Sequence, residues 1–340
     1  MHKWQKITLK IVLAISLTTT SIYFFAPWEY ALYYMKPLPV TVEAEVQQAT
    51  KNGLDGIIIY SQRASEPAHI YTSGWHNRAE QIPAYGSALF KIASIAKLYE
   101  AVAVAKLAAA DQLDLDKTLA DYLPDLAQRI EYADQITIRM MVMHRSGIPN
   151  FTDQDGFDWA SSSLDTLALA LDKPADFQPG TDYAYSNTNY LLLQILMSKT
   201  LGYDYTQYIE NHILTPLKLH DTYFSIHEVD NTRLMSGYYV GYEDDLKHLD
   251  QGYVASAENV GRFIRALNDG TLLNKQEQAI YSSLYEYGHT GWVLGYSSIA
   301  KYHSDIDTVV VQFTNTTGDD RVMLTNIIYN RVLNILRNQS

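Results

Sequence analysis

The pattern of hydrophobic and polar positions divides the chain into strand-like ends and a helix-rich middle. Short runs rich in β-branched residues and bounded by turn residues predict strands at 54–60, 68–74, 295–302 and 307–316. Helical patterns with caps and stop signals predict helices at 42–52, 94–110, 115–122, 137–146, 163–171, 190–202, 204–213, 256–270 and 319–336. Strands at both ends with helices between them predict an α/β (α+β) domain that carries an inserted all-helical lobe.

The N-terminal segment is basic and then apolar. Lys3, Lys6 and Lys10 precede an apolar run at 11–17, and no A-x-A-like cleavage site follows the apolar stretch that ends at Ala26. We expect an uncleaved signal-anchor that holds an exported domain at the cell membrane, in the periplasm or outside the cell. The alternative is a cleaved signal peptide and a secreted protein.

The domain boundaries follow from these two patterns. Residues 1–38 are assigned to the anchor and its linker, and residues 39–338 to the folded domain. Within that domain we expect a sheet lobe formed by 39–111 and 250–338, and a helical lobe formed by 112–249.

Composition narrows the range of partners and of chemistry. The net charge is −12, and the basic residues form no cluster beyond the N-terminus, so nucleic acid is not an expected partner. The chain has no cysteine, which excludes disulfides, thiolate metal sites and a cysteine nucleophile. Its ten histidines lack the spacing of metal ligands. We therefore predict neither a metal nor a cofactor.

The helix predicted at 94–110 carries the first candidate chemistry. It is rich in alanine, contains no glycine or proline, and is apolar nearly all round, so it should be buried. Ser94 lies in its first turn, and Lys97, three residues on, shares the same face. A serine beside a buried lysine at a helix N-terminus is one way to activate a nucleophile. A serine cap with a snorkelling lysine is the structural alternative.

Two further stretches strengthen the catalytic interpretation. Tyr185 and Asn187 lie at i and i+2 in a loop before an apolar helix, where extended backbone would point both side chains the same way. The segment His289-Thr290-Gly291-Trp292 follows Gly288 and leads into a strand. The two glycines, at 288 and 291, allow close approach of another chain or a ligand.

These stretches, in this order, resemble the motifs of the penicillin-recognising serine hydrolases, in the branch that holds class C β-lactamases and D-alanyl-D-alanine carboxypeptidases. The family motifs S-x-x-K, Y-x-N and H-T-G stand here at 94–97, 185–187 and 289–291. The segments 144–149 and 256–263 are similar to two further family segments that carry no chemistry. The resemblance implies a β-lactamase/transpeptidase-like fold, in which helices flank an antiparallel sheet.

The resemblance also implies roles for these residues. Ser94 would attack a carbonyl carbon, and Lys97 and Tyr185 would share the proton. Asn187 would hold the substrate amide, and His289 would offer a donor or a positive charge to a substrate carboxylate. Thr290 and Gly291 complete the third motif. The backbone N–H groups of Ser94 and Trp292 would form the oxyanion hole.

The pairing of Y-S-N with H-T-G is that of the carboxypeptidase-like members, so the resemblance implies hydrolysis of D-alanyl peptides or similar amides. Trp292 departs from the small or hydroxylated residue often found there, which leaves the peptide substrate open. The same machinery would also suit a class C-like β-lactamase or an esterase. A third alternative is a membrane-tethered penicillin-binding sensor with little turnover.

Overall fold

A six-stranded antiparallel sheet forms the centre of the fold. The computed structural model describes residues 3–159 and 165–339. The strand order is β3-β2-β1-β10-β9-β8, so the two ends of the chain meet where β1 pairs with β10. The strands are β1 Gly56–Arg63, β2 His69–Asn77, β3 Ile82–Pro83, β8 His289–Val293, β9 Tyr296–His303 and β10 Thr308–Thr314. Both predicted terminal strand pairs therefore belong to one sheet.

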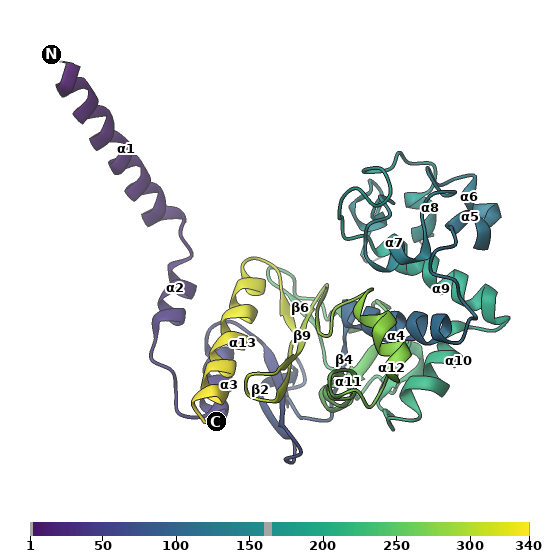
Figure 1. Cartoon of the computed structure of the whole chain (residues 1–340). Coiled ribbons are helices and arrows are strands. Elements are labelled where there is room, and N and C mark those ends of the chain that lie inside the picture. Colours follow the sequence, from purple (N-terminus) through teal and green to yellow (C-terminus); the bar gives the residue numbers. More distant parts are fainter. Residues whose placement is uncertain (1–2, 160–164, 340) are drawn as a thin grey trace.

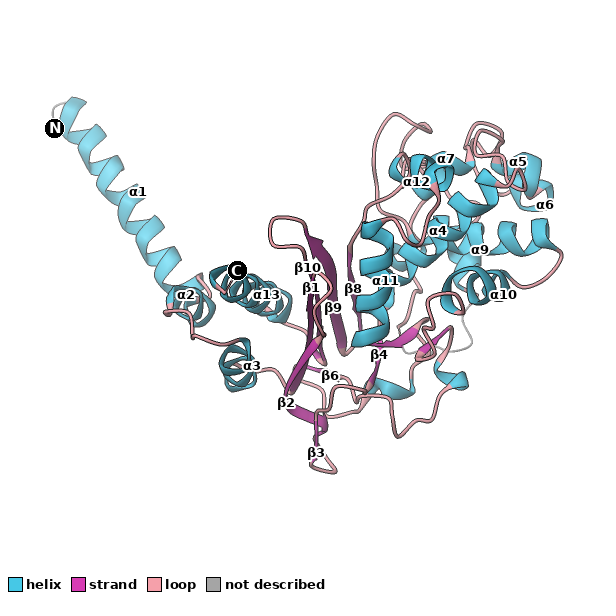
Figure 2. Ribbon diagram, turned by 60° about the horizontal axis from the view of Figure 1, so that its bottom comes forward, coloured by secondary structure: helices cyan, strands magenta, loops and turns pink. Residues whose placement is uncertain are grey.

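Helices cover both faces of this sheet (Figure 1, Figure 2). One face packs against α3 Val42–Lys51 and α13 Arg321–Asn338, and the other against α11 Ala257–Asp269. The apolar α4 Ala96–Ala109 follows the 3-10 turn η1 Ala93–Ile95, which contacts the edge strand β8. This layered arrangement confirms the predicted fold class.

The middle of the chain is mostly helical. Its helices as far as Leu214 are α5 Leu119–Tyr122, α6 Pro124–Ala127, α7 Ile138–Val142, η2 Phe151–Asp153, α8 Thr166–Ala170, α9 Asn187–Leu201, α10 Tyr205–Ile209 and the π-helical turn η3 Glu210–Leu214. The prediction of a helix at 163–171 begins outside the described residues. Within them, α8 begins at Thr166, after its N-cap Asp165. The helix predicted at 115–122 is shorter, because Thr118 caps it only at Leu119.

Five short strands lie outside the central sheet. β4 Leu89–Lys91 precedes the helical segment, and β5 Thr222–Tyr223, β6 Tyr238–Tyr239, β7 Val254–Ser256 and β11 Thr316–Thr317 follow it. The later part of the chain also contains the turns η4 Ile226–Glu228 and η5 Leu246–His248 and the helix α12 Lys275–Ser282. β4, β7 and β5 form a three-stranded sheet, and β6 pairs with β11. The segment predicted as an all-helical lobe, 112–249, thus contains strands in its last part. Two- and three-residue strands are too short for a detectable alternation of polar and apolar positions.

The segment before residue 39 is more than a linker, which departs from the predicted domain boundary. After α1 Lys3–Phe25 comes a short helix, α2 Trp28–Met35, whose Tyr30 and Tyr33 are buried in the same core cluster as α3 and α13. Arg331 of α13 donates to the main-chain carbonyls of Tyr33, Lys36 and Pro37. Residues 28–37 are therefore fixed to the folded domain.

The same arginine forms a buried ion pair with α3. Arg331 Nε and Nη2 donate to the two carboxylate oxygens of Glu45 at 2.7 and 3.0 Å, and the Tyr33 hydroxyl donates to Glu45 at 2.5 Å. Removing one partner of such a buried pair costs about 3–5 kcal/mol, because it leaves an uncompensated charge. The contacts of Arg331 and Glu45 with the N-terminal segment thus contribute substantially to the stability of this face of the fold.

Helix α1 extends away from the rest of the molecule (Figure 1). Many of its apolar side chains are exposed, among them Trp4, Leu13 and Phe25. Within the described residues no single helix has the length and apolar content to cross a membrane. The pair Lys10–Phe25 and Trp28–Met35, bent by 82°, meets the requirement by length and composition taken together.

Candidate active site

The nucleophile predicted by the sequence lies at the start of the buried helix. Ser94 is in η1 and Lys97 in the first turn of α4, and the Lys97 Nζ lies 3.3 Å from the Ser94 Oγ. Ala93, immediately before the serine, has a φ of +50°, in the left-handed region that non-glycine residues rarely adopt. Strain of this kind is typical of functional sites, where the surrounding structure enforces it. The left-handed conformation of Ala93 changes the direction of the chain between β4 and α4.

The second predicted motif meets the first at the serine. The hydroxyl of Tyr185 lies 2.7 Å from Ser94 Oγ, and Lys97 Nζ donates to Asn187 Oδ1 at 2.8 Å. Ser186, between them, has extended backbone (φ −138°, ψ 119°), so the two flanking side chains point the same way, as predicted. Two pairs of residues about 90 positions apart in sequence thus form one hydrogen-bonded group.

A histidine and an asparagine from the preceding loop hold this motif in place. His144 Nδ1 accepts from the Ser186 N–H at 3.1 Å, and its ring lies 4.4 Å from the Tyr185 ring. Asn150 Oδ1 accepts from the Asn187 main-chain N–H at 3.0 Å. Burial and the nearby Lys97 charge lower the pKa of His144 to about 3, so it stays a neutral acceptor. His144 thus has a structural part in the loop, which agrees with the expectation that the segment 144–149 carries no chemistry. Asn150 was not predicted.

The third motif forms the edge strand beside the serine. Within β8, which pairs with β9, Gly291 lies opposite Ser298. A Cβ placed on Gly291 would come within 2.3 Å of the Ile92 carbonyl oxygen and 3.1 Å of the Ala93 Cβ, so only glycine fits. β8 therefore runs directly against the backbone that precedes Ser94. The predicted oxyanion donors, the N–H groups of Ser94 and Trp292, flank this close approach.

Both ring nitrogens of His289 are hydrogen-bonded within the protein. Its Nε2 lies 3.0 Å from the Tyr285 hydroxyl, and its Nδ1 is bonded to the Thr290 carbonyl oxygen. Because a carbonyl only accepts, Nδ1 carries the proton, and Nε2 of the neutral ring accepts from Tyr285. Burial lowers the pKa of His289. In this arrangement the ring offers neither a free N–H nor a positive charge to a substrate carboxylate.

Ser94, Lys97, Tyr185 and Asn187 line a cavity of about 940 Å³, together with His289, Thr290 and Trp292. Trp292 is 36% exposed, and its ring packs edge-to-face on Trp159 at 5.6 Å. The Phe157 ring packs in turn on the Trp159 ring, with 4.9 Å between the ring centroids. The aromatic rings form an apolar wall next to the polar group at Ser94, so the cavity can take a substrate with an apolar side chain.

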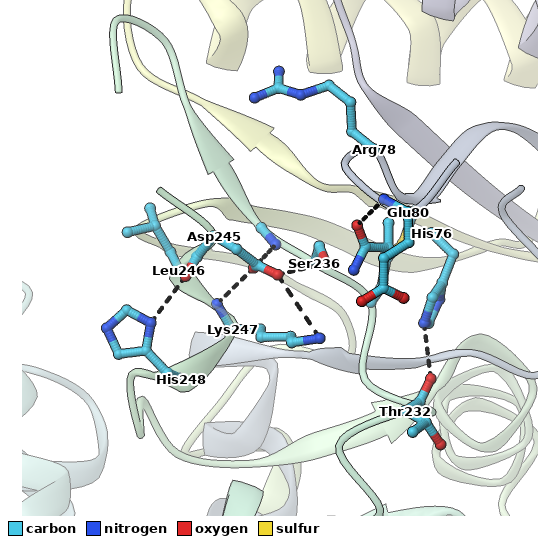
Figure 3. A network of polar contacts seen from close by, with 12 residues as sticks. His76, Arg78, Glu80, Thr232, Ser236, Asp245, Leu246, Lys247 and His248 are labelled. Atoms are coloured by element: carbon cyan, nitrogen blue, oxygen red, sulfur yellow. Dashed lines mark hydrogen bonds and ion pairs between the residues drawn. The ribbon is translucent and has the colours of Figure 1, made fainter. Parts of the chain in front are cut away.

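Polar contacts fix the segment that leads to another side of the cavity. Asp245 accepts from the Ser236 Oγ at 2.7 Å and from the Lys247 N–H at 3.0 Å (Figure 3). Lys91, in the strand that leads to Ser94, is fully buried and donates to the carbonyls of Leu246 and Leu249. This network joins the strand before the nucleophile to the segment whose continuation, residues 250–253, lines the cavity.

Comparison with known proteins agrees with this geometry. The model of the Beta-lactamase family matches residues 44–286. The chain belongs to the beta-lactamase family. The predicted family is therefore confirmed, and family membership supports the predicted class of enzyme, a serine hydrolase.

Relatives and solved structures extend the family match. Protein flp of Staphylococcus aureus (strain MW2) is 29% identical over 154 residues, which are 44% of this chain and 31% of that protein. The matched segment thus spans about a third of that relative. D-amino acid amidase from Ochrobactrum anthropi SV3 superposes with a TM-score of 0.78 at 21% identity, over 88% of this chain and 98% of that one. A penicillin-binding protein from Bacillus halodurans superposes with a TM-score of 0.71 at 21% identity, over 86% and 99%. At this identity the two structures show a shared fold.

Proposed function

We propose that the protein is a serine amidohydrolase that forms an acyl-enzyme on Ser94. The observation that carries the proposal is the position of Ser94 Oγ, 2.7 Å from the Tyr185 hydroxyl and 3.3 Å from Lys97 Nζ, in an accessible cavity. Two proton-transfer groups within hydrogen-bond reach of one hydroxyl satisfy the geometric requirement for an activated nucleophile.

The proton can be followed through the reaction. As Ser94 Oγ bonds to the amide carbonyl carbon, its proton passes to the Tyr185–Lys97 pair. The same pair gives that proton to the leaving nitrogen when the C–N bond breaks. A water then attacks the ester, its proton takes the same route, and Ser94 recovers a proton as the acid departs. Asn187 is placed by its bond to Lys97 to fix the lysine and to meet the substrate amide.

For the substrate we propose an amide of a D-amino acid or of a D-alanyl peptide. The likeness in fold to a D-amino acid amidase supports this class. Among the described residues that line the cavity, Lys97 is the one lysine or arginine, and it already bonds to Asn187. With both nitrogens of His289 occupied, a terminal carboxylate has no evident cationic partner. A D-alanyl-D-alanine carboxypeptidase, which the Y-S-N and H-T-G motifs favour, is the second candidate.

A matched pair of substrates distinguishes these candidates. We expect N-acetyl-D-alanyl-D-alanine amide to be hydrolysed with a kcat/KM at least about tenfold above that of the same peptide with a free carboxylate. A desolvated carboxylate without a partner costs at least about 1.4 kcal/mol, which is tenfold in rate. The rates would be measured beside those for benzylpenicillin, a cephalosporin and a short-chain ester.

The same panel states what would contradict the proposal. A faster reaction with the free carboxylate would make the carboxypeptidase the better assignment. Many rapid turnovers of benzylpenicillin would identify a β-lactamase, and cleavage of esters alone would identify an esterase. A lasting penicillin adduct with no turnover of any substrate would favour the sensor.

We also propose that the protein is exported and held at the cell membrane by residues 1–27. The basic and then apolar sequence and the exposed apolar side chains of α1 support this proposal. Tyr30 and Tyr33 belong to the folded domain, so the tether ends before α2 rather than at residue 38.

Two truncations test both parts of this proposal. We expect the full chain to stay with membranes after cell lysis, and a variant without residues 1–27 to be soluble and active. Removal of residues 1–38 should lower the free energy of unfolding by several kcal/mol relative to that variant, because Arg331 and Glu45 lose their buried partners. Urea unfolding of the two soluble variants measures this difference. A new N-terminus near residue 27 in the exported protein would instead identify a cleaved signal peptide.

A further inference from the structure

The carboxylate of α4 lies at the cavity and has no role in the reaction described above. Glu100 is three residues after Lys97, on the same face of the helix, and its side chain lines the cavity that contains Ser94. It is only 2% exposed. A glutamate is rarely buried to this degree without a partner of opposite charge.

The immediate surroundings of Glu100 are neutral. Gln194 of α9 donates from Nε2 to Glu100 Oε1 at 2.8 Å. Three phenols, those of Tyr190, Tyr205 and Tyr253, also interact electrostatically with Glu100. Burial raises the pKa of each phenol and so keeps it protonated and neutral. The other buried glutamate of the described residues, Glu45, is paired directly with Arg331. Within residues 3–159 and 165–339, Glu100 has no direct ion pair of this kind.

The positive charge that acts on Glu100 is that of Lys97. Burial raises the pKa of Glu100 to about 7, against the opposing effect of the Lys97 charge and of the hydrogen bond from Gln194. The influence is mutual, because the interaction between two charges is one energy that both groups share. Glu100 therefore changes its charge in the neutral pH range, within one helical turn of the lysine at the nucleophile.

We propose that Glu100 is a positioning residue that acts through Lys97, as the buried counter-charge that sets the pH at which Lys97 exchanges its proton. The proposal rests on the proposed function, because it assigns the lysine its part in proton transfer. An ionised Glu100 stabilises the ammonium form of Lys97, and a protonated or neutral residue at position 100 does not. The pH range of the reaction is then fixed in part by a residue that the substrate need not touch.

The sign of the expected effect does not depend on which form of Lys97 is active. Without the neighbouring anion, the ammonium form is less stable and Lys97 loses its proton at lower pH. If the ammonium is required, the alkaline limb of the kcat/KM profile moves to lower pH. If the free amine is required, the acidic limb does. In either case the limb that Lys97 controls moves down by about two pH units, the effect of a unit charge about one helical turn away at an effective dielectric of about 20.

The test is a set of kcat/KM profiles between pH 5 and 10 with a neutral short-chain ester, for the wild type and three variants. Glu100→Gln keeps the shape and removes the charge, and Glu100→Asp keeps the charge. Glu277→Gln is the matched control, since Glu277 pairs with Lys106 of the same helix but lies outside the cavity lining. We expect a limb of the profile to move in Glu100→Gln alone. A profile that coincides with that of the wild type, or an equal shift in Glu277→Gln, overturns the proposal.

A second readout separates this inference from the proposed hydrolase activity. In protein labelled with ¹⁵N-lysine, the Lys97 signal is identified by its absence in Lys97→Ala, and its titration is followed by NMR. We expect it to titrate at lower pH in Glu100→Gln than in the wild type, even if no substrate is hydrolysed. An unchanged Lys97 titration in folded Glu100→Gln protein overturns the inference, whereas loss of hydrolysis in the wild type overturns only the proposed function. The Glu100→Gln protein should fold at pH 8, because the substitution removes a buried charge.

Discussion

Ser94→Ala is expected to lower the rate of hydrolysis of amides, esters and β-lactams alike by about four orders of magnitude or more. One nucleophile serves every substrate in the proposed mechanism, and loss of a serine nucleophile in a hydrolase typically has an effect of this size. Ser94 is partly exposed in the cavity, and the substitution removes one oxygen without opening a void in the core. The unfolding temperature should therefore stay within a few degrees of that of the wild type.

The measurement is kcat/KM on the full panel of substrates, with protein free of contaminating hydrolase. Ser87→Ala is a suitable control, because Ser87 is exposed and lies outside the cavity lining. Its activity should equal that of the wild type. Ester hydrolysis by pure Ser94→Ala protein at more than a trace would mean that another group attacks the carbonyl carbon.

The second large effect is expected for the two proton-transfer residues. Lys97→Ala and Tyr185→Phe should each slow acylation by about 10²–10⁴-fold, the usual contribution of a positioned acid or base. The double variant should be little slower than the slower single variant. Both groups contact the same Ser94 oxygen, and residues that act as a unit in one proton transfer give strongly non-additive losses.

Single-turnover acylation by a chromogenic ester measures these rates without interference from deacylation. Losses that multiply in the double variant would show that Lys97 and Tyr185 act independently, and the shared proton would be the wrong description. Tyr183→Phe provides a control, since Tyr183 is an exposed tyrosine in the same loop and does not line the cavity.

The parts of the site that could be predicted from the sequence depend on local geometry. The spacing of Ser94 and Lys97 places them on one helical face wherever the helix lies. Extended backbone at Ser186 points the side chains of Tyr185 and Asn187 in the same direction. The glycine at 291 indicated close approach, and its neighbour proves to be the backbone before the nucleophile.

Other parts of the site depend on contacts between distant segments. Asn150 holds Asn187 across 37 residues of sequence, and Glu100 meets Gln194 across 94. Glu100 was visible in the sequence only as one charge in an apolar helix, and nothing local indicates which charged residue of a buried helix faces a cavity. The role predicted for His289 depended instead on free ring nitrogens, and two residues close to it in sequence, Tyr285 and Thr290, occupy them.

The fold shows the same division. The long strands and amphipathic helices were predicted because their periodicity is long enough to detect. The docking of α2 was not, because Tyr30 and Tyr33 stand in a stretch whose aromatic residues also suit a membrane interface. The decisive partners, Arg331 and Glu45, lie 286 residues apart. A buried ion pair between the two ends of a chain leaves no local pattern.

The central claim is that Ser94 forms the acyl-enzyme, and time-resolved intact mass after mixing with benzylpenicillin tests it most directly. In a β-lactam adduct the ring-opened leaving group stays attached near Tyr185, where it hinders the water that deacylation needs, so the adduct should persist. We predict a mass increase equal to one whole penicillin molecule, located by peptide mapping on Ser94 and absent from Ser94→Ala. An adduct on another residue, or an equal mass increase in Ser94→Ala, would contradict the claim.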